Sequence, residues 1–408
     1  MTADTTWIGE GANALAGEFK TPLYVYSRER IEAAYRAYES AFASVPHRVC
    51  YALKANSALG VLRVFASMGA GADIVSGGEL RQALRAGFQP EDVVFSGVGK
   101  TDDELSLGLE TGIGEFNVES ESELGRLSTL ARSRGARASI TLRVNPDVDP
   151  KSHPYISTGL RENKFGVPIE EAPRILREAR AMGGLGVSGL QCHIGSQLRD
   201  LGPAAEAVRA ISSLSRALLA EGFTLRTIDI GGGLGVDYDG AGAPTPSELS
   251  ALVLPQIEDL GLKLLLEPGR SLVASAGALL TRVIAIKTNG AKRFVITDAG
   301  MNDLLRPSLY SAYHRIVNVS AAKGAPRTSA DIVGPVCESG DFFARDREIA
   351  ETKEGDLLAV LDAGAYSFAM ASNYNFRPRA AEVLIENGTP RLIRRRETFE
   401  DLTRCEIS

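Results

Sequence analysis

The stretch YALKAN, at residues 51–56, ends an apolar run with Lys54 and is followed by a helix-like segment from about residue 58. Because the run is apolar, the amine of Lys54 is expected to leave a largely apolar wall. Partial desolvation disfavours the charged form of a lysine, and a neutral amine is what a Schiff base to an aldehyde requires. The alternative is a lysine that lies along the strand end and reaches water with its ammonium. The choice depends on what the other strand ends carry.

Strands and helices alternate through the first two-thirds of the chain. Apolar, β-branched runs end in polar or glycine-rich turns and are followed by helix-like stretches, which implies a parallel sheet. Eight such units in roughly 240 residues fit a (β/α)8 TIM-type barrel, with a doubly wound open sheet as the alternative. The predicted strands lie at 48–53, 71–75, 92–95, 114–117, 138–144, 187–192, 226–230 and 262–266. Helices are predicted at 78–86, 101–110, 119–134, 170–182 and 203–220.

Polar residues gather at the predicted strand ends. In a barrel, the carboxyl ends of the strands open onto one face, where barrel enzymes place their chemistry. Residues far apart in the sequence are therefore expected to converge on one pocket. They include Lys54, Asp73, Arg143, Asn145, His193, Asp229 and Glu267.

The glycine run Gly231, Gly232 and Gly233 is the candidate phosphate site. Glycines let backbone N–H groups approach an anion with no Cβ in the way, and barrels often bind phosphate after strands seven and eight. The run is not a dinucleotide fingerprint, because Val236 stands where GxGxxG has its last glycine. The alternative is a plain tight turn.

A carboxylate, Glu267, follows the apolar run of the last predicted strand and needs a partner there. Arg270 could pair with it in a structural ion pair. In the functional interpretation, Glu267 holds a proton on a heterocyclic nitrogen. A phosphate cradle, a Schiff-base lysine and such a carboxylate together describe a site for pyridoxal 5'-phosphate.

His193 follows strand six and has Ser196 close behind it. A lone histidine is usually structural, but this one can stack on a flat cofactor while Ser196 offers a hydroxyl to the phosphate. No metal site is expected, because the chain has only 4 histidines and no two at ligand spacing.

The last third of the chain reads as a β-rich domain, either a sandwich or a barrel. We place the barrel at 30–270 and the β-rich domain at 1–29 and 271–408, where residues 23–26 can add a strand. The basic run at 391–396 is interpreted as a solvated edge strand. Strands are predicted at 280–287, 292–298, 314–319, 329–333, 357–362, 380–386 and 390–395.

The composition is that of an ordinary globular protein of 408 residues, with 44% hydrophobic and 24% charged residues. A net charge of -6 argues against a nucleic-acid partner. No signal peptide and no membrane span are recognised at the N-terminus or elsewhere. The 4 scattered cysteines form no CxxC pair, so a reducing cytoplasm is expected and a disulfide framework is not.

Taken together, the motifs resemble those of the fold-III pyridoxal-phosphate decarboxylases over nearly the whole chain, from about residue 21 to 398. The order and number of the matching stretches make coincidence an inadequate explanation. They are YALKAN (51–56), DIVSGGEL (73–80), ISTG (156–159), NKFG (163–166), HIGSQ (193–197), GGG (231–233), EPGR (267–270), RPSLY (306–310), CESGD (337–341) and DAGAY (362–366).

The resemblance implies that Lys54 carries the cofactor as an internal aldimine and that His193 stacks on the ring. It also implies that Glu267 faces the pyridine nitrogen and that Cys337 protonates Cα after carbon dioxide leaves. The family's sites are shared between two subunits, which implies a homodimer. The implied cofactor-binding residues are Lys54, Asp73, His193, Ser196, Gly231, Gly232, Gly233, Glu267, Gly269, Arg270 and Tyr366.

The expected substrate is meso-2,6-diaminopimelate, converted to L-lysine in the last step of lysine biosynthesis. Its distal end carries an ammonium and a second carboxylate, so recognition requires guanidinium groups and an acid. Glu338 is informative, because ornithine decarboxylases carry a shorter acid there, and the pair Arg306 and Tyr310 is the most specific. The implied substrate-binding residues are Arg270, Arg306, Tyr310, Glu338 and Tyr366.

Three other functions stay open at this point. The first is a related decarboxylase that acts on another amino acid, including one tethered to a carrier protein. The second is an amino-acid racemase, which should place a basic residue rather than Glu267 opposite the ring nitrogen. The third is a non-catalytic pyridoxal-phosphate-binding protein, against which the length of the chain and Cys337 weigh.

Overall fold

The chain forms two compact units in a computed structural model that describes residues 7–8, 11–149, 158–159 and 163–407. The first, here called the barrel unit, comprises Glu32–Val236 and Ala243–Leu272. The second, here called the β unit, comprises Met1–Ile31, Asp237–Gly242 and Val273–Ser408. Residues 156 and 157 of the ISTG motif lie outside the described residues.

The barrel unit is a closed barrel of eight parallel strands, as predicted. The barrel closes because β10 pairs with β2 and β5 pairs with β6, so the open-sheet alternative is wrong. A short β7 (Val167–Pro168) pairs with the end of β6. Around the barrel the strands are β2 (His47–Ala52), β3 (Gly71–Ile74), β4 (Val93–Phe95), β5 (Glu115–Val118), β6 (Ala138–Asn145), β8 (Leu185–Gln191), β9 (Thr227–Asp229) and β10 (Lys263–Leu266).

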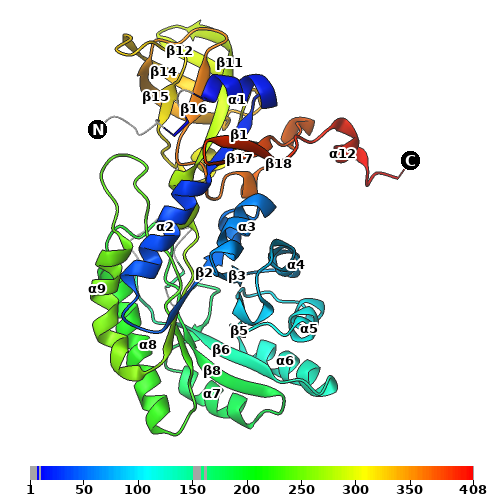
Figure 1. Cartoon of the computed structure of the whole chain (residues 1–408), viewed down its shortest axis with the longest axis vertical. Coiled ribbons are helices and arrows are strands. Elements are labelled where there is room, and N and C mark those ends of the chain that lie inside the picture. Colours follow the sequence, from blue (N-terminus) through cyan, green and yellow to red (C-terminus); the bar gives the residue numbers. More distant parts are fainter. Residues whose placement is uncertain (1–6, 9–10, 150–157, 160–162, 408) are drawn as a thin grey trace. The chain divides into compact units, whose positions relative to one another are not determined.

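Helices surround the strands of this unit (Figure 1). Side chains of Ser76, Thr101, Ser120 and Thr245 cap four of them by accepting an N–H three residues on. The strands are buried on both faces because helices cover the outside, as parallel sheets require. The helices are α2 (Arg28–Ala41), α3 (Leu59–Ser67), α4 (Gly77–Ala86), α5 (Asp102–Thr111), α6 (Glu121–Ser133), α7 (Ala172–Ala181), α8 (Gly202–Ala220), α9 (Pro246–Ile257) and the short α10 (Arg270–Val273).

The β unit is built on one mixed nine-stranded sheet, so this part of the chain is β-rich as predicted. As predicted, the early segment adds a strand: β1 lies between β11, to which it is antiparallel, and β17, to which it is parallel. The strands are β1 (Leu23–Ser27), β11 (Gly277–Asn289), β12 (Lys292–Thr297), β13 (Ile316–Asn318), β14 (Arg327–Val333), β15 (Phe342–Ala350), β16 (Leu357–Val360), β17 (Ala381–Glu386) and β18 (Thr389–Arg394). Its helices are α1 (Ala12–Phe19), α11 (Arg306–Tyr310) and α12 (Phe399–Thr403).

Two features of the β unit were not anticipated from the sequence. Strand β15 pairs with β14 at an end of the sheet, although residues 345–348 are all charged. The segment Asp237–Gly242 packs in this unit, where Arg315 donates to the carbonyl of Asp237 at 3.1 Å and the ring of Tyr238 contacts that of His314.

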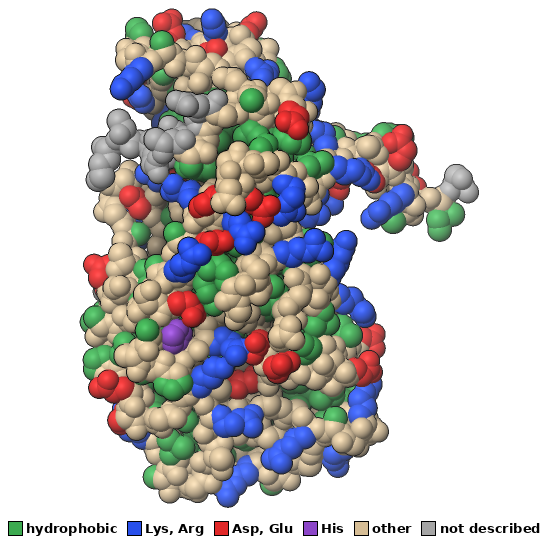
Figure 2. Space-filling model, viewed as in Figure 1, with side chains coloured by type: hydrophobic (Ala, Val, Ile, Leu, Met, Phe, Trp, Pro, Cys, Tyr) green, Lys and Arg blue, Asp and Glu red, His purple; other side chains and the backbone are tan. Residues whose placement is uncertain are grey.

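Charged side chains of both signs are interspersed on the face that Figure 2 shows, in keeping with the moderate net charge of -6. Within the described residues, none of the helices combines the length and the apolar character that crossing a membrane requires.

Candidate active site

Lys54 stands in a short 3-10 turn (Leu53–Ala55) that follows β2 directly. Its Nζ donates to Oδ2 of Asp73, at the end of β3, over 2.6 Å. The Asp73 side chain is fully buried, whereas that of Lys54 is 37% exposed. The carboxylate therefore anchors an amine that still reaches open space. A buried carboxylate favours the charged form of this amine, whereas an apolar wall alone would favour the neutral form.

A second carboxyl group, Glu79, lies at the start of α4 near Lys54. The N–H of Val75 donates to Oε2 of Glu79 at 2.7 Å, and Ser76 caps the same helix. Burial raises the pKa of Glu79 to about 7, while the bond from Val75 and the charge of Lys54 act in the opposite direction. A group with this pKa changes its protonation near neutral pH.

Glu267 is buried at the end of β10 and is bonded by neutral side chains. Oε1 accepts from Asn117 at 3.0 Å and from Ser96 at 3.3 Å, and Oε2 accepts from Gln191 at 3.0 Å. Burial raises the pKa of Glu267 well above its ordinary value, and the nearby carboxyls of Asp229 and Asp73 raise it further. This carboxyl group is therefore unusually basic, which suits a residue that faces a protonated ring nitrogen.

The three glycines after β9 stand where side chains would not fit. A Cβ on Gly232 would lie 2.2 Å from the carbonyl oxygen of Glu267, and one on Gly233 would lie 2.2 Å from that of Gly195. Gly231 and Gly233 also have positive φ values of 66° and 106°. The turn therefore exposes backbone close to its neighbours in a way that only glycine permits.

A guanidinium and a hydroxyl group meet beside the barrel end. Nε and Nη2 of Arg270 donate to Oγ of Ser196 at 3.2 and 3.1 Å. Gly269, just before Arg270, packs against Ala52 and Ala55 on either side of Lys54, and a Cβ on it would lie 3.1 Å from each of their Cβ atoms. The predicted residues of the EPGR and HIGSQ motifs are thus brought together.

His193 follows β8 and accepts a hydrogen bond from the N–H of Gly232 at its Nδ1, over 3.2 Å. Burial lowers its pKa well below the ordinary value, and the positive charges of Arg143 and Lys54 lower it further. The imidazole is therefore neutral and is held against the glycine turn.

A cleft of about 410 Å³ opens at this end of the barrel. Val75 and Val98 on its wall are 37% and 39% exposed. Charged and apolar side chains therefore both line the cleft. Its lining is Lys54, Val75, Ser96, Gly97, Val98, Gly99, Arg143, Thr158, Phe165, Gln191, His193 and Glu267.

These residues fit pyridoxal phosphate. The close-packed glycine turn beside Arg270 and Ser196 suits a phosphate, because a cation, a hydroxyl and unobstructed backbone converge there. Glu267 suits a protonated ring nitrogen, and the amine of Lys54 suits the aldehyde. Each of the three functional groups of the cofactor thus has a chemically matching group in the protein.

The remaining predicted residues belong to the β unit. Cys337 is exposed, and its N–H donates to Oδ1 of Asn375 at 2.8 Å. Glu338 beside it is also exposed. The buried carboxylate of Asp341 holds their loop by accepting from the N–H groups of Met301 and Val336, both at 2.6 Å. The thiol is thus presented to solvent on a braced turn.

Arg306 starts α11 and is buried. Nη1 lies 2.8 Å from Nε2 of His314, and the guanidinium stacks on the ring of Tyr238. Because a guanidinium only donates, Nε2 of His314 is the acceptor and its Nδ1 donates to the carbonyl of Leu361 at 2.9 Å. The contacts with His314 and Tyr238 therefore fix the orientation of the Arg306 guanidinium.

The two predicted tyrosines of this unit are half-buried. Tyr310 ends α11, whose Ser308 hydroxyl donates to the carbonyl of Gly340 in the loop of Cys337, over 2.5 Å. Tyr366 has a positive φ of 54°. This conformation is uncommon for a tyrosine and marks a constrained turn.

Sequence reasoning missed several residues of the cleft. Ser96, Asn117 and Gln191 bond Glu267 but were not predicted as site residues. Each is an ordinary polar residue at or just after the end of a strand, and no motif distinguishes it. The polar strand-end rule that found Lys54 would have found Ser96 and Asn117 if it had been applied to the ends of predicted strands three and four, and Gln191 if it had been extended to the last residues inside strand six.

Comparisons with known proteins show the family of this chain. Residues 28–274 match the family model described as "Pyridoxal-dependent decarboxylase, pyridoxal binding domain". The diaminopimelate decarboxylase of Aquifex aeolicus is 50% identical over 393 residues, covering 96% of this chain and 93% of the relative. That of Pseudomonas aeruginosa is 51% identical over 394 residues, covering 97% and 94%.

Solved structures match along the same length. The diaminopimelate decarboxylase of Helicobacter pylori complexed with L-lysine superposes with a TM-score of 0.93 at 44% identity, covering 96% of this chain and 98% of that one. The enzyme from M. jannaschii in co-complex with L-lysine also gives 0.93, at 42% identity and coverages of 97% and 94%. Lysine decarboxylase from Selenomonas ruminantium is more distant, with a TM-score of 0.83 at 25% identity, covering 93% and 96%. The chain therefore belongs to the pyridoxal-dependent decarboxylases and, within them, to the diaminopimelate decarboxylases.

Proposed function

We propose that this chain decarboxylates meso-2,6-diaminopimelate to L-lysine and carbon dioxide with pyridoxal 5'-phosphate, the last step of lysine biosynthesis. The observation that carries the proposal is the joint placement of Lys54, Glu267 and the glycine turn at one end of the barrel. Relatives support the proposal, because two diaminopimelate decarboxylases share about half of their residues with this chain over nearly its whole length. Two solved relatives also hold L-lysine.

The barrel residues would hold the cofactor at three points. The backbone at Gly233, with Ser196 and Arg270, would bind its phosphate, because the N–H groups of Gly231 and Gly232 already donate to Asp229 and His193. Lys54 would bond its aldehyde carbon and give that bond up to the substrate amine. The cofactor, when bound, supplies an electron sink for the charge left at Cα.

Proton positions follow from the pKa directions. The raised pKa of Glu267 favours a proton held between this carboxyl group and the ring nitrogen. The neutral His193 adds no second positive charge beside the ring and offers it a flat surface. Asp73 accepts the hydrogen bond from Nζ of Lys54, and Glu79 can exchange protons at neutral pH.

Cys337 is the proposed proton donor to Cα, supported by its exposure on a braced loop. We propose that the enzyme is a cytoplasmic homodimer and that each Cys337 loop serves the barrel of the partner subunit. The acid Glu338 would bind the distal ammonium of the substrate. Arg306 and Tyr310 would bind its distal carboxylate, supported by the fixed direction of Arg306.

Two alternatives remain to be tested beside this function. The related fold of a lysine decarboxylase favours a decarboxylase with another substrate, but its identity of 25% is half that of the diaminopimelate enzymes. A racemase should avoid a strong acid–base partner at the ring nitrogen, and Glu267 is such a partner.

The test is release of carbon dioxide by the purified protein with added pyridoxal phosphate. Meso-diaminopimelate, ornithine, arginine and lysine are compared. Release from diaminopimelate alone, with L-lysine as product, is expected. Release from another amino acid instead would show that this amino acid, and not diaminopimelate, is the substrate. If no carbon dioxide is released although the cofactor is bound, the carrier-tethered or racemase function is favoured.

A further inference from the structure

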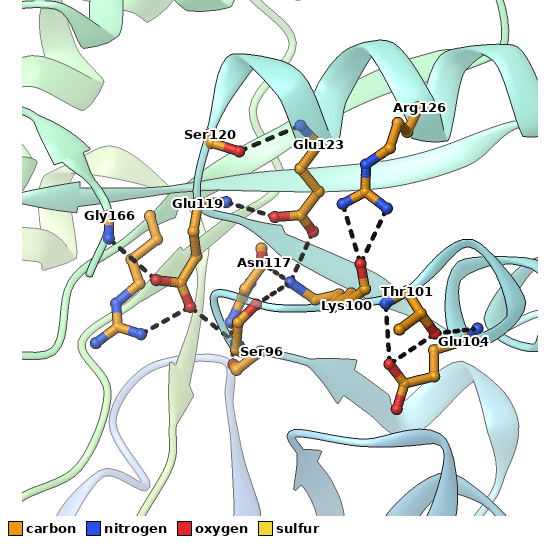
Figure 3. A network of polar contacts seen from close by, with 12 residues as sticks. Ser96, Lys100, Thr101, Glu104, Asn117, Glu119, Ser120, Glu123, Arg126 and Gly166 are labelled. Atoms are coloured by element: carbon orange, nitrogen blue, oxygen red, sulfur yellow. Dashed lines mark hydrogen bonds and ion pairs between the residues drawn. The ribbon is translucent and has the colours of Figure 1, made fainter. Parts of the chain in front are cut away.

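A single buried carboxylate, that of Glu119, joins three segments around the cleft. Glu119 directly follows β5 and is 6% exposed. Its Oε1 accepts from the N–H of Gly97 at 3.0 Å and from Nη1 of Arg143 at 2.9 Å. Its Oε2 accepts from the N–H of Gly166 at 3.0 Å. Figure 3 shows the bond between Gly166 and Glu119.

Each bonded group belongs to the cleft wall or adjoins it. Gly97 and Arg143 line the cleft, and Gly166 directly follows Phe165, which also lines it. The guanidinium of Arg143 lies 4.8 Å from the ring centroid of Phe165, a cation–π contact. One carboxylate therefore ties the loop after β4, the end of β6 and the segment before β7 to one another.

The loop after β4 is also fixed from its other side. Nζ of Lys100 donates to the carbonyl of Gly97 at 2.8 Å, to that of Asn117 at 2.7 Å and to Oε1 of Glu123 at 2.7 Å (Figure 3). The second oxygen of Glu123 accepts from the N–H of Glu119 at 3.1 Å. The N–H and the carbonyl group of Gly97 are therefore both hydrogen-bonded. Its φ of 106° lies in a region that residues with a side chain rarely adopt.

The brace reaches the centre of the site through Ser96. Ser96 precedes Gly97 and donates to Oε1 of Glu267, while Asn117 donates to both Ser96 and Glu267. If Gly97 shifted, its neighbour Ser96 would lose the geometry of its hydrogen bond to Glu267. Val98 on the other side of Gly97, which lines the cleft, would be displaced as well.

A second buried carboxylate on the same strand provides a comparison. Glu115 begins β5 and is 7% exposed, and it accepts bonds from the hydroxyls of Thr141, Ser188 and Thr227. It is as buried and as well bonded as Glu119, yet neither it nor these partners line the cleft. If burial and bonding alone mattered, the two carboxylates would be equivalent.

We propose that Glu119 is a positioning residue of the decarboxylation reaction, which sets the wall of the cleft by holding Gly97, Arg143 and Gly166 with one carboxylate. This inference rests on the proposed function. The groups that would hold the cofactor phosphate follow other strands, and Glu267 keeps its bonds from Asn117 and Gln191, so we expect the brace to act mainly on the amino-acid substrate rather than on cofactor affinity.

The test compares Glu119→Gln, Glu119→Asp and the matched control Glu115→Gln as holoenzymes. Glu119→Gln keeps the shape of the side chain but loses the charge-assisted bonds, so kcat/KM should fall roughly 10- to 100-fold. Glu119→Asp keeps the negative charge opposite Arg143 and therefore the fold, but it cannot reach all three segments and should lose a similar factor. Glu115→Gln should lower Tm while kcat/KM per folded enzyme stays within twofold of the wild type.

Ligand affinities separate positioning from general damage. In both Glu119 variants, the Kd of L-lysine, read from the visible absorbance of the bound cofactor, should rise at least tenfold while the Kd of pyridoxal phosphate stays within twofold. The inference is overturned if kcat/KM of both Glu119 variants stays within twofold of the wild type, or if Glu115→Gln loses as much. It is also overturned if cofactor affinity falls in step with activity.

The same experiment keeps the two proposals apart. The rates are measured with whichever of the four amino acids the wild type decarboxylates. A wrong substrate assignment, or a failed reaction, then shows in the wild type itself. A wrong role for Glu119 shows only in the variants, and the two Kd values are informative even without turnover.

Discussion

Replacing Gly233 with alanine tests whether the glycine turn is an anion cradle or only a tight connection. Gly233 has a φ of 106°, and a Cβ there would lie 2.2 Å from the carbonyl oxygen of Gly195. Relief of that overlap requires the turn after β9 to move by about 1 Å, since carbon and oxygen atoms repel well below their contact distance. The N–H groups of the turn would move with it.

The expected cost has two parts. The left-handed backbone costs any residue with a Cβ roughly 1–2 kcal/mol. Displaced N–H groups lose charge-assisted bonds to the phosphate, worth roughly 1.5–3 kcal/mol, which raises the cofactor Kd about 10- to 150-fold. Only the second part concerns the cofactor.

Gly240→Ala is the matched control, because Gly240 has a φ of 89° and nothing lies within 4 Å of the position that a Cβ would take there. Gly240→Ala should lower the free energy of unfolding only by the cost of the left-handed backbone, roughly 1–2 kcal/mol, and leave the cofactor Kd unchanged. The Kd is measured by titrating cofactor-free protein with pyridoxal phosphate, and stability by urea unfolding. If Gly233→Ala binds the cofactor like the wild type while losing no more stability than Gly240→Ala, the glycine turn is no phosphate cradle.

Three further changes test other parts of the site. Lys54→Ala should abolish both carbon dioxide release and the visible absorbance of the bound cofactor, and normal turnover in this variant would refute the role of Lys54. Cys337→Ala should lower kcat roughly 100- to 10,000-fold, the usual contribution of a general acid, with the cofactor Kd unchanged; a wild-type kcat would exclude Cys337 as the donor. Glu79 has a folded pKa of about 7 against an ordinary 4.5, so the folded protein binds more protons than the unfolded one between these values. The wild type should therefore lose roughly 3 kcal/mol relative to Glu79→Gln as the pH rises from about 5 to 8, whereas an equal difference in urea-unfolding free energy at both pH values would contradict the assignment.

The barrel was predictable because its strands are buried on both faces. Continuous apolar runs such as 262–266 follow from that burial, and a polar residue ends most runs where the strand meets the cleft. Strand β15 was not predictable in the same way. It lies at an end of its sheet and pairs with β14 on one side, so four successive charged residues are compatible with it.

The candidate site was predictable where chemistry restricts the residue type. Only a lysine can form the Schiff base, and only glycine fits the turn after β9, so Lys54 and Gly233 were visible in the sequence. The partners of Glu267 were not visible, because any neutral donor at the right place would serve. Glu119 was hidden for another reason, since its role depends on three groups that meet only in the folded barrel.

The central position of β1 has a consequence for the synthesis of the chain. Of its two neighbours, β17 is made after β11: the hydroxyl of Tyr26 donates to Glu382, 356 positions later. At 5–20 residues per second, the ribosome needs roughly 20–70 s to deliver that partner. During this time Leu23 and Val25, which are fully buried in the finished protein, have no β17 to cover them. A nascent chain that stalls before residue 381 should therefore retain the strands of the barrel but keep an unfinished sheet edge open to chaperones and proteases.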